Sequence, residues 1–399
     1  MDTVNKRYKR NIVFEYLHTF FRNTNFTHGI WAAYLLVRGY SLLDIGVFET
    51  VFHITGLTME VPTGVLADLF GRKNSRLLGI ISYLIYIVLI LFTNSYFLII
   101  IAFIFCGISF TFESGSQDAL IYDSLKEMNQ EDKYMRVNGR IEVLYQVSTV
   151  IVLFITGILL EGQHETDYYL TIGAMAIAFI MLFSMKETHI RHKTKGLSFK
   201  DRINDHFVKT WKVVTSKKRL FLLMIFGALL MAPVTSMVIY AQEYFIFDGF
   251  RESWMLYFLA LHGLIAGFGG FMAERIEKKF GERKLMIILP ILLSACFFAT
   301  LIPTYGFIGF IVIGFIDSAL YVVIVEYINR LIPSETRASV LSFFGMCFSL
   351  VMILTFPLMG LIGTLTTIWF SYLFVALVVV AVVIVLQILI SKNYFKIID

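Results

Sequence analysis

Long apolar runs recur along the whole chain of 399 residues, and short clusters of charged residues separate them. An α-helix needs roughly 20 residues to cross a hydrocarbon core about 30 Å thick, and many of the runs reach that length. Hydrophobic residues make up 58% of the sequence and charged residues 16%. In soluble domains, roughly 45 to 50% of the residues are hydrophobic and about 25% are charged. The sequence therefore predicts an all-α membrane protein.

Twelve segments are predicted to span the membrane, six on either side of a polar, basic stretch. The first six would form an N-terminal six-helix bundle within 1–185, and the last six a C-terminal bundle within 220–399. The stretch 186–219 would be a cytoplasmic linker between them. The predicted spans are 12–36, 41–66, 77–93, 96–122, 141–160, 168–185, 220–245, 254–273, 285–301, 305–328, 338–362 and 368–390.

The distribution of Lys and Arg favours twelve spans with both chain termini in the cytoplasm. Of the 34 Lys and Arg residues, all but Arg22, Arg38 and Arg251 then fall in cytoplasmic loops or tails, as the positive-inside rule requires. Arg76 is counted in a loop, because the third predicted span begins at residue 77. An odd number of spans would place basic clusters such as 275–284 on the wrong side.

Two sequence echoes relate the predicted halves. Segment 67–73 carries Ala-Asp and then Gly-Arg-Lys, and segment 273–284 carries Ala-Glu and then Gly-Glu-Arg-Lys. Tyr122-Asp123 is echoed by the segment 327–330 at nearly the same offset. Internal repeats of this kind are common in secondary transporters. The sequence thus predicts a transporter built from two related halves.

The segment 64–73, Gly-Val-Leu-Ala-Asp-Leu-Phe-Gly-Arg-Lys, resembles the signature loop between the second and third helices of the major facilitator superfamily. With the predicted spans, linker and half-repeat, the resemblance covers essentially the whole chain. It implies two pseudo-symmetric six-helix bundles and a cytoplasmic latch that breaks and reforms between outward-open and inward-open states. A solvated turn is the alternative for the two cations of this loop. The implied latch residues are Gly64, Asp68, Gly71, Arg72 and Lys73, with Asp123 as a carboxylate partner.

The subclass within the superfamily is less clearly marked. Drug:proton antiporters of this family usually carry an arginine in the fourth helix, where this chain has Phe103, and a Gly-Pro pair late in the fifth, where it has Thr156-Gly157-Ile158. The segments 59–64 and 114–125 nevertheless resemble a group of bacterial transporters described as multidrug exporters. Export is therefore preferred, and import stays open.

Ionisable residues lie within the predicted spans, where each costs about 2.5 to 3.5 kcal/mol on insertion scales. In each span they recur at spacings of three or four residues, which places them on one helix face. Such faces are expected to line a protein or water-filled interior. The ionisable, polar and glycine residues of these faces are Glu15, His18, Arg22, Asn25 and Gly29 in the first span, Glu49, His53, Gly56 and Glu60 in the second, Glu113 and Gln117 in the fourth, and Asp317 and Tyr321 in the tenth.

Several of these groups are candidates for proton coupling. The resemblance places the first, fourth, seventh and tenth helices around a central cavity, which would bring Arg22, Glu113 and Asp317 to similar depth. We expect Glu113 to pair with Arg22 in one state and to take up a proton in another. A permanent structural ion pair is the alternative. Glu49 and Glu60 are further candidates for coupling.

Other polar and aromatic side chains on the same helices are candidates for the substrate cavity. Two histidines among them would serve as a proton relay or as hydrogen-bond partners between helices. Asp118 and Glu142 lie toward the cytoplasmic side and are assigned to the latch network. The predicted cavity residues are His18, Asn25, His53, Gln117, Tyr240 and Tyr321.

No phosphate-binding loop, paired metal-ligand motif or nucleophile constellation is found in the sequence. Cys106, Cys296 and Cys347 lie singly in apolar segments. We therefore expect no cofactor, no metal and no enzymatic activity, and transport driven by an ion gradient. Acidic residues within spans favour protons, with sodium as the alternative. The net charge of +5 reflects basic cytoplasmic loops and implies no nucleic acid.

Three functions remain after these exclusions. The leading hypothesis is proton-coupled export of hydrophobic or cationic small molecules by a monomer in a bacterial cell membrane. The second is symport that imports a polar metabolite, sugar or organic anion, with Arg22 binding a carboxylate. The third, a membrane enzyme or sensor that reuses the fold, has no support from the residues.

Overall fold

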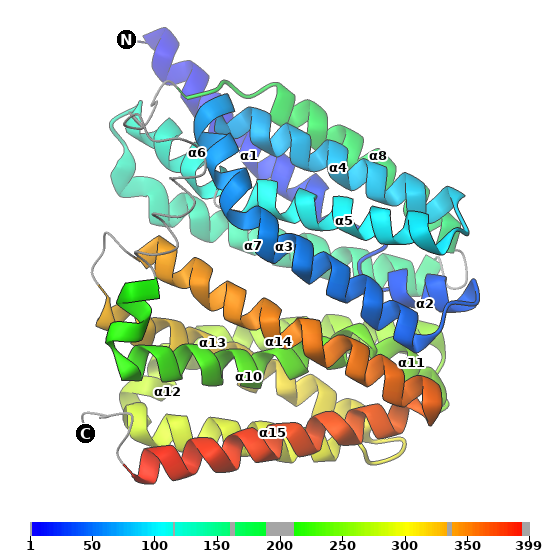
Figure 1. Cartoon of the computed structure of the whole chain (residues 1–399). Coiled ribbons are helices and arrows are strands. Elements are labelled where there is room, and N and C mark those ends of the chain that lie inside the picture. The colour runs from blue at the N-terminus through cyan, green and yellow to red at the C-terminus, as the bar shows by residue number, and fades with distance from the viewer. Residues whose placement is uncertain (1, 115, 160–163, 189–210, 333–336, 393–399) are drawn as a thin grey trace. The chain divides into compact units, whose positions relative to one another are not determined.

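The computed structural model describes residues 2–114, 116–159, 164–188, 211–332 and 337–392, and every regular element in this part is a helix (Figure 1). Ten described helical segments are long and apolar enough to cross a membrane. The chain is thus an all-α, multi-pass membrane protein, as predicted, while the number of twelve spans stays a prediction. The central part of the predicted linker lies outside the described residues.

The chain divides into two compact units, which are described separately. Unit 1 comprises residues 1–31 and 51–203, and unit 2 comprises residues 32–50 and 204–399. Helix α3 (Leu42–Phe70) therefore begins in unit 2 and continues in unit 1. The predicted bundles differ from these units chiefly in the segment 32–50.

Unit 1 is an assembly of helices in which α1 packs against α7 and α8, and α4 against α5 and α8. In Figure 1 its helices run in colour from the blue of α1 to the green of α8. Its elements besides α3 are α1 (Asp2–Asn23), α4 (Arg72–Phe92), α5 (Tyr96–Glu113), α6 (Ser116–Lys126), the 3-10 helix η1 (Glu131–Lys133), α7 (Tyr134–Leu159) and α8 (His164–Phe183).

The first predicted span is broken in the structure. Helix α1 ends at Asn23, and α2 (Trp31–Val37) begins eight residues later. Between them, Oδ1 of Asn25 accepts hydrogen bonds from the backbone N and the hydroxyl of Thr27 at 3.1 and 2.7 Å, and Nδ2 of Asn25 donates to Tyr83 at 2.6 Å. These side chains supply hydrogen bonds that the interrupted helix no longer makes.

Unit 2 contains most of α2, the start of α3 and the remaining helices. Helix α10 packs against α13 and α14, and α12 against α13 and α15. The eighth and ninth predicted spans both fall in α12, which has a non-helical residue, Gly281, inside it. The elements are α10 (Lys218–Ile239), α11 (Ala241–Phe247), α12 (Glu252–Ala299), α13 (Gly306–Leu331), α14 (Arg337–Leu365) and α15 (Ile368–Ser391).

Glycines hold α12 and α13 close together. A Cβ added at Gly269 would clash with the backbone of Phe315, and one at Gly314 would lie 2.6 Å from the backbone oxygen of His262. Lipid removes the hydrophobic drive that packs helices in water, so close backbone approach at small residues becomes a main source of association. The α12–α13 pair is therefore sensitive to added volume at these glycines.

Gly269→Ala should lower the free energy of unfolding by about 1 to 3 kcal/mol, the usual cost of overpacking. Gly267→Ala is the matched control, because a Cβ there meets nothing within 4 Å, and alanine gains up to about 1 kcal/mol over glycine within a helix. Thermal unfolding of the detergent-solubilised protein measures both. Equal midpoints for the two variants would contradict the close packing.

Corresponding turns in the two halves share a backbone conformation. Gly71, between α3 and α4, has φ +99°, and Gly281, within α12, has φ +73°. Both values lie in the left-handed region that residues with a Cβ rarely adopt. The first sequence echo thus corresponds to the same tight turn in each half.

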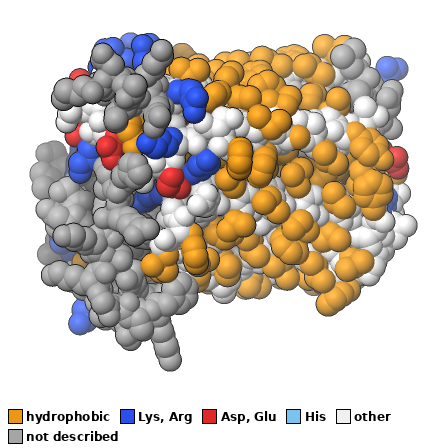
Figure 2. Space-filling view, turned by 90° about the horizontal axis from the view of Figure 1, so that it is seen from above, with side chains coloured by type: hydrophobic (Ala, Val, Ile, Leu, Met, Phe, Trp, Pro, Cys, Tyr) orange, Lys and Arg blue, Asp and Glu red, His pale blue; other side chains and the backbone are white. Residues whose placement is uncertain are grey.

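The surface of the helices suits a lipid bilayer. Figure 2 shows one face, on which hydrophobic side chains form a broad band and Lys and Arg gather mainly toward one end. Phe92, Phe271 and Leu354 are each about two-thirds exposed. In water such a band would be an aggregation hazard, whereas acyl chains cover it without cost.

Candidate functional site

The predicted latch lies around the turn at Gly71. Nε of Arg72 is 4.0 Å from Oδ2 of Asp123, and the ammonium of Lys73 lies 5.0 Å from the centre of the Phe183 ring. The carboxylate of Glu187 accepts hydrogen bonds from the backbone N of Arg72 and of Lys73 at 3.2 and 3.0 Å. It thereby caps the N-terminus of α4, where an anion is favoured.

Gly64 and Asp68 are the other two predicted latch residues of this segment. Gly64 is exposed within α3, and the side chain of Asp68 lies outside the described part of the chain. Sequence reasoning missed the contact of Glu187 with this turn, since Glu187 lies far along the chain, after α8.

Unit 2 has its own ion pairs near the corresponding turn. Arg330, at the end of α13, lies 3.1 Å from Glu277 and 3.0 Å from Glu326, and Arg219 pairs with Glu282. Each half thus has ion pairs near its glycine turn. Arg72 follows Gly71 in the first half, whereas Glu277 precedes Gly281 in the second.

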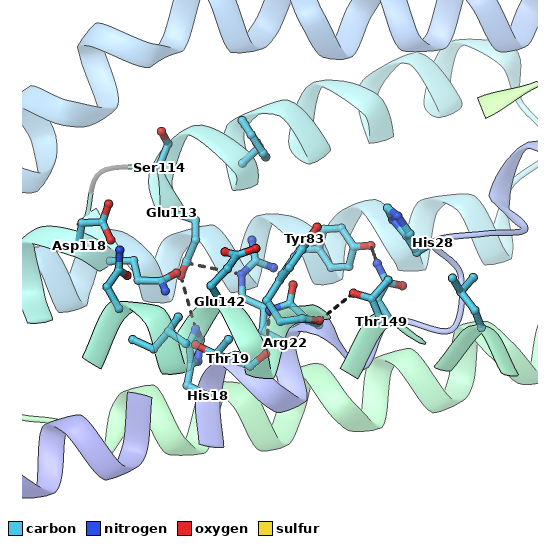
Figure 3. A pocket seen from close by; sticks show the side chains of 18 residues that line it. His18, Thr19, Arg22, His28, Tyr83, Glu113, Ser114, Asp118, Glu142 and Thr149 are labelled. Carbon is cyan, nitrogen blue, oxygen red and sulfur yellow. Dashed lines mark hydrogen bonds and ion pairs between the residues drawn. The ribbon is translucent and has the colours of Figure 1, made fainter. Parts of the chain in front are cut away.

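A cavity of about 500 Å³ lies among the helices of unit 1 (Figure 3). This volume is within the range of small-molecule sites, about 300 to 1,000 Å³. Most of the residues that line it have polar side chains, and they come from the broken end of α1 and from α4, α5, α6 and α7. The lining residues are His18, Thr19, Arg22, Asn23, Asn25, His28, Tyr83, Phe110, Glu113, Ser114, Gln117, Asp118, Asn138, Ile141, Glu142, Tyr145, Thr149 and Leu153.

Arg76 joins two buried carboxylates behind the cavity wall. Its Nη1 and Nη2 lie 2.6 and 2.8 Å from the two oxygens of Glu15, and its Nε and Nη2 lie 2.9 and 2.7 Å from Oε1 of Glu113. The side chain of Arg76 is completely buried and that of Glu15 nearly so. A planar guanidinium suits such bidentate pairing, so Arg76 fixes Glu113 at the cavity wall.

Two further basic groups of α1 approach Glu113 from the cavity side. Nε of Arg22 lies 3.6 Å from Oε2 of Glu113, and Nε2 of His18 lies 3.5 Å from its Oε1. Arg22 also lies over the Tyr83 ring, 5.9 Å from its centre. Both groups sit beyond close hydrogen-bond distance, unlike the tight contacts of Arg76. We call Glu15, His18, Arg22, Arg76 and Glu113 the charged cluster.

Carboxylates outnumber guanidinium groups at this site. Asp118 and Glu142 line the cavity together with Glu113 and Arg22. Including Arg76 and Glu15 from the charged cluster, four carboxylates face two guanidinium groups. A cavity with this balance attracts cations and repels anions, and its low-dielectric walls strengthen both effects.

The structure brings five predicted residues together on the cavity: His18, Arg22, Asn25, Glu113 and Gln117. It places others elsewhere on α3. Glu49 lies in the part of α3 that belongs to unit 2, and His53 is buried within unit 1 away from the lining. Glu60 accepts a hydrogen bond from Ser114 at 3.4 Å.

Predicted residues of the second half lie within unit 2. Oδ1 of Asp317 is buried and has no hydrogen-bond partner among the described residues. The hydroxyl of Tyr240 donates toward the backbone oxygens of Leu42 and Phe356, at 3.0 and 3.2 Å. Tyr321 is half exposed. None of the three lines the cavity of unit 1.

Arg76 is the main residue of the charged cluster that sequence reasoning placed wrongly. It was counted in a cytoplasmic loop, but α4 begins at Arg72, so Arg76 lies one turn inside the helix and points into the protein. Its helical spacing from Gly79 and Tyr83 is the signal that identifies this face. Asp118 and Glu142, which the sequence assigned to the latch network, line the cavity.

Comparisons with known proteins agree with this architecture. The sequence model of the Major Facilitator Superfamily matches residues 17–306 and 253–396. The chain is 24% identical over 328 residues to YxaM of Bacillus subtilis (strain 168), an uncharacterized MFS-type transporter. The aligned region covers 78% of this chain and 79% of YxaM.

Solved structures show the same fold. A mutant of the nucleoside transporter NupG has a TM-score of 0.81 at 13% identity, covering 95% of this chain and 98% of NupG. A D-xylose-proton symporter has a TM-score of 0.71 at 13% identity, covering 98% of both chains. From its helices, its repeated turn and the family match over more than half its length, the chain belongs to the Major Facilitator Superfamily.

Proposed function

We propose that the chain is a proton-coupled secondary transporter that exports hydrophobic or cationic small molecules by alternating access. The observation that carries the proposal is the charged cluster on the wall of a polar, acid-rich cavity. Charges are costly within a bilayer and persist where they serve a pathway for ions or substrate. A group that binds protons beside a substrate cavity is the minimum that proton coupling requires.

The cavity supports a cation more than a purely apolar compound. Asp118 and Glu142 offer carboxylates, while Phe110, Tyr83 and Tyr145 offer aromatic surface that attracts cations as well as apolar groups. An organic anion fits poorly, because Arg22 already lies beside Glu113. We therefore favour organic cations as the substrate class.

Symport of a polar, uncharged metabolite is the second candidate. Asn138, Gln117 and Thr149 line the cavity with amide and hydroxyl groups, which suit a nucleoside or a sugar. The structural neighbours are a nucleoside transporter and a D-xylose-proton symporter. At such low sequence identity the likeness supports a shared fold and not a shared substrate. This candidate therefore rests on the hydrogen-bonding groups of the cavity.

Transport into proteoliposomes separates the two candidates. With an acidic interior, an antiporter should accumulate ethidium, a cationic dye, as protons leave. With an acidic exterior, a symporter should accumulate labelled uridine or D-xylose as protons enter. If neither gradient changes the flux of any of these probes, the proposal of proton coupling is wrong.

Asp118→Asn and Glu142→Gln should each weaken ethidium binding about tenfold, which corresponds to roughly 1.4 kcal/mol. Each change removes one carboxylate from the cavity wall and leaves its shape nearly unaltered. Glu274→Gln is the matched control, because Glu274 is exposed and pairs with Lys278. Equilibrium fluorescence titration of the purified protein measures the affinity, and unchanged binding in both cavity variants would exclude them as cation ligands.

The remaining expectations belong to the same proposal. Asp317, Glu49 and Glu60 are secondary candidates for coupling, and the turn at Gly71 for the cytoplasmic latch. We propose that the protein is a monomer in the bacterial cell membrane, with both termini in the cytoplasm. The distribution of Lys and Arg supports this orientation of the termini.

A further inference from the structure

The two ring nitrogens of His18 have different partners. Nδ1 lies 3.0 Å from the backbone oxygen of Ala178 in α8, and the side chain is completely buried. A carbonyl oxygen only accepts hydrogen bonds, so Nδ1 must carry a hydrogen. In a neutral imidazole the other nitrogen, Nε2, then has a lone pair and no hydrogen.

That lone pair faces a carboxylate. Nε2 of His18 is 3.5 Å from Oε1 of Glu113, and it has no other hydrogen-bond partner among the described residues. A lone pair opposite a carboxylate oxygen is repulsive in a buried site, whereas a proton between the two atoms makes the contact attractive. The geometry therefore has a place for one proton.

The proton fits the ring better than the carboxyl group. Oε1 of Glu113 already accepts hydrogen bonds from Nε and Nη2 of Arg76, and protonation at this oxygen would weaken both. Oε2 has no hydrogen-bond partner among the described residues, but it lies 3.6 Å from Nε of Arg22, so protonation there would weaken that ion pair. Arginine stays charged in proteins, so its demand for an anion is permanent. Arg76 thus holds Glu113 in its ionised form.

We infer that Nε2 of His18 carries the coupling proton, and that Glu113 stays ionised as its counter-ion. The inference rests on the proposed proton coupling and names the group that performs it. The step is a simple proton exchange with water that enters the cavity, and no bond between heavy atoms changes.

The surroundings explain how a cationic substrate would displace this proton. Beside His18 stand Glu15 and Arg22 of its own helix, Arg76 of α4 and Glu113 of α5, while α8 presents the Ala178 carbonyl. The cavity wall adds the other titratable groups: His28, Tyr83, Asp118, Glu142 and Tyr145.

A cation bound at these cavity carboxylates would repel a positive charge on His18 and favour release of its proton. Arg22, which contacts Glu113 less tightly than Arg76 does, is free to move toward Glu113 when the imidazole becomes neutral. One monovalent substrate cation would then exchange for one proton, as in an electroneutral antiporter.

Solid-state NMR of the ¹⁵N-histidine-labelled protein in liposomes locates the proton directly. The His18 signals are those that disappear in His18→Gln. We expect both His18 nitrogens of the wild type to be protonated at neutral pH, and Glu113→Gln to convert the ring to its neutral form. His262 is the internal reference, because its Nδ1 also lies near a carbonyl, 2.8 Å from Phe310, without an ion pair among the described residues.

A neutral His18 ring in the wild type across the pH range of transport would overturn the inference. So would an infrared band of a protonated carboxyl group that disappears in Glu113→Gln. Either result would assign the proton to the carboxylate.

Transport gives an independent test. His18→Gln keeps a side-chain donor for the Ala178 oxygen but cannot take up a proton. It should reduce gradient-driven ethidium accumulation by roughly 10 to 100-fold and reduce ethidium–ethidium exchange, which needs no net proton movement, far less. His262→Gln is the matched control and should keep normal accumulation.

The outcomes separate this inference from the proposed function. A wild type without gradient-driven flux would refute proton coupling, while the NMR result would still decide where the proton lies. A coupled wild type and an equally coupled His18→Gln would refute the role of His18 alone.

Discussion

Arg76→Met should lower the free energy of unfolding by about 3 to 5 kcal/mol, the usual cost of breaking a buried ion pair by removing one partner. Methionine fills a similar volume, but Glu15 and Glu113 would be left buried without the guanidinium that joins them. Glu15 then loses its ion pair, and Glu113 keeps only its longer contacts to His18 and Arg22. The measurement is thermal unfolding in detergent, together with the yield of protein in the membrane.

Arg330→Met is the matched control. Arg330 also pairs with two carboxylates, Glu277 and Glu326, but it is half exposed, and exposed pairs contribute about 0 to 1 kcal/mol. Adding Glu15→Gln and Glu113→Gln to Arg76→Met removes the unpaired charges and should recover most of the lost stability. An Arg76→Met variant as stable as the wild type would mean that the charged cluster does not hold unit 1 together.

Glu113→Gln should abolish proton coupling, with gradient-driven ethidium accumulation falling about 100-fold. Glutamine keeps the size of the side chain and still accepts a hydrogen bond from Arg76. It removes the negative charge that His18 and Arg22 share, so neither a proton nor a cation is retained at the site. Accumulation in proteoliposomes under an imposed pH gradient measures the loss, and unchanged elution from a sizing column shows that the variant is folded.

Glu326→Gln serves as the control for Glu113→Gln, because Glu326 is half exposed on α13 and contacts Arg330. If coupling survived in Glu113→Gln and was lost in Glu60→Gln or Asp317→Asn, the coupling site would lie at one of those acids. The charged cluster would then be a structural ion network.

The fold was largely predictable because the bilayer forces apolar helices of a fixed length. Where the sequence reasoning departs from the structure, local hydrogen bonding is the cause. Asn25 makes hydrogen bonds to Thr27 and Tyr83 at the break after Asn23. A prediction based on the length of apolar runs does not detect such bonds. By contrast, the turn at Gly281 lies between the two predicted spans that α12 contains.

The site was predictable where one helix carried the pattern. Glu15, His18 and Arg22 recur at helical spacing, and they do share a face of α1. Sequence reasoning missed Arg76 because it lies close behind the basic pair Arg72-Lys73. A count of charges cannot distinguish an arginine in a loop from an arginine one turn inside a helix. Which carboxylates it joins depends on how α1, α4 and α5 pack, and no local sequence pattern contains that information.

The start of α3 bears on how this polypeptide is assembled. Leu42 and Gly46 pack against α14 so closely that a Cβ at Gly360 would overlap the backbone of Leu42. A cut within 189–210 would therefore yield two fragments, of which the second lacks residues 32–50 and with them part of unit 2. During synthesis, those residues must await the emergence of α14, so unit 2 is completed only when nearly the whole chain has left the ribosome.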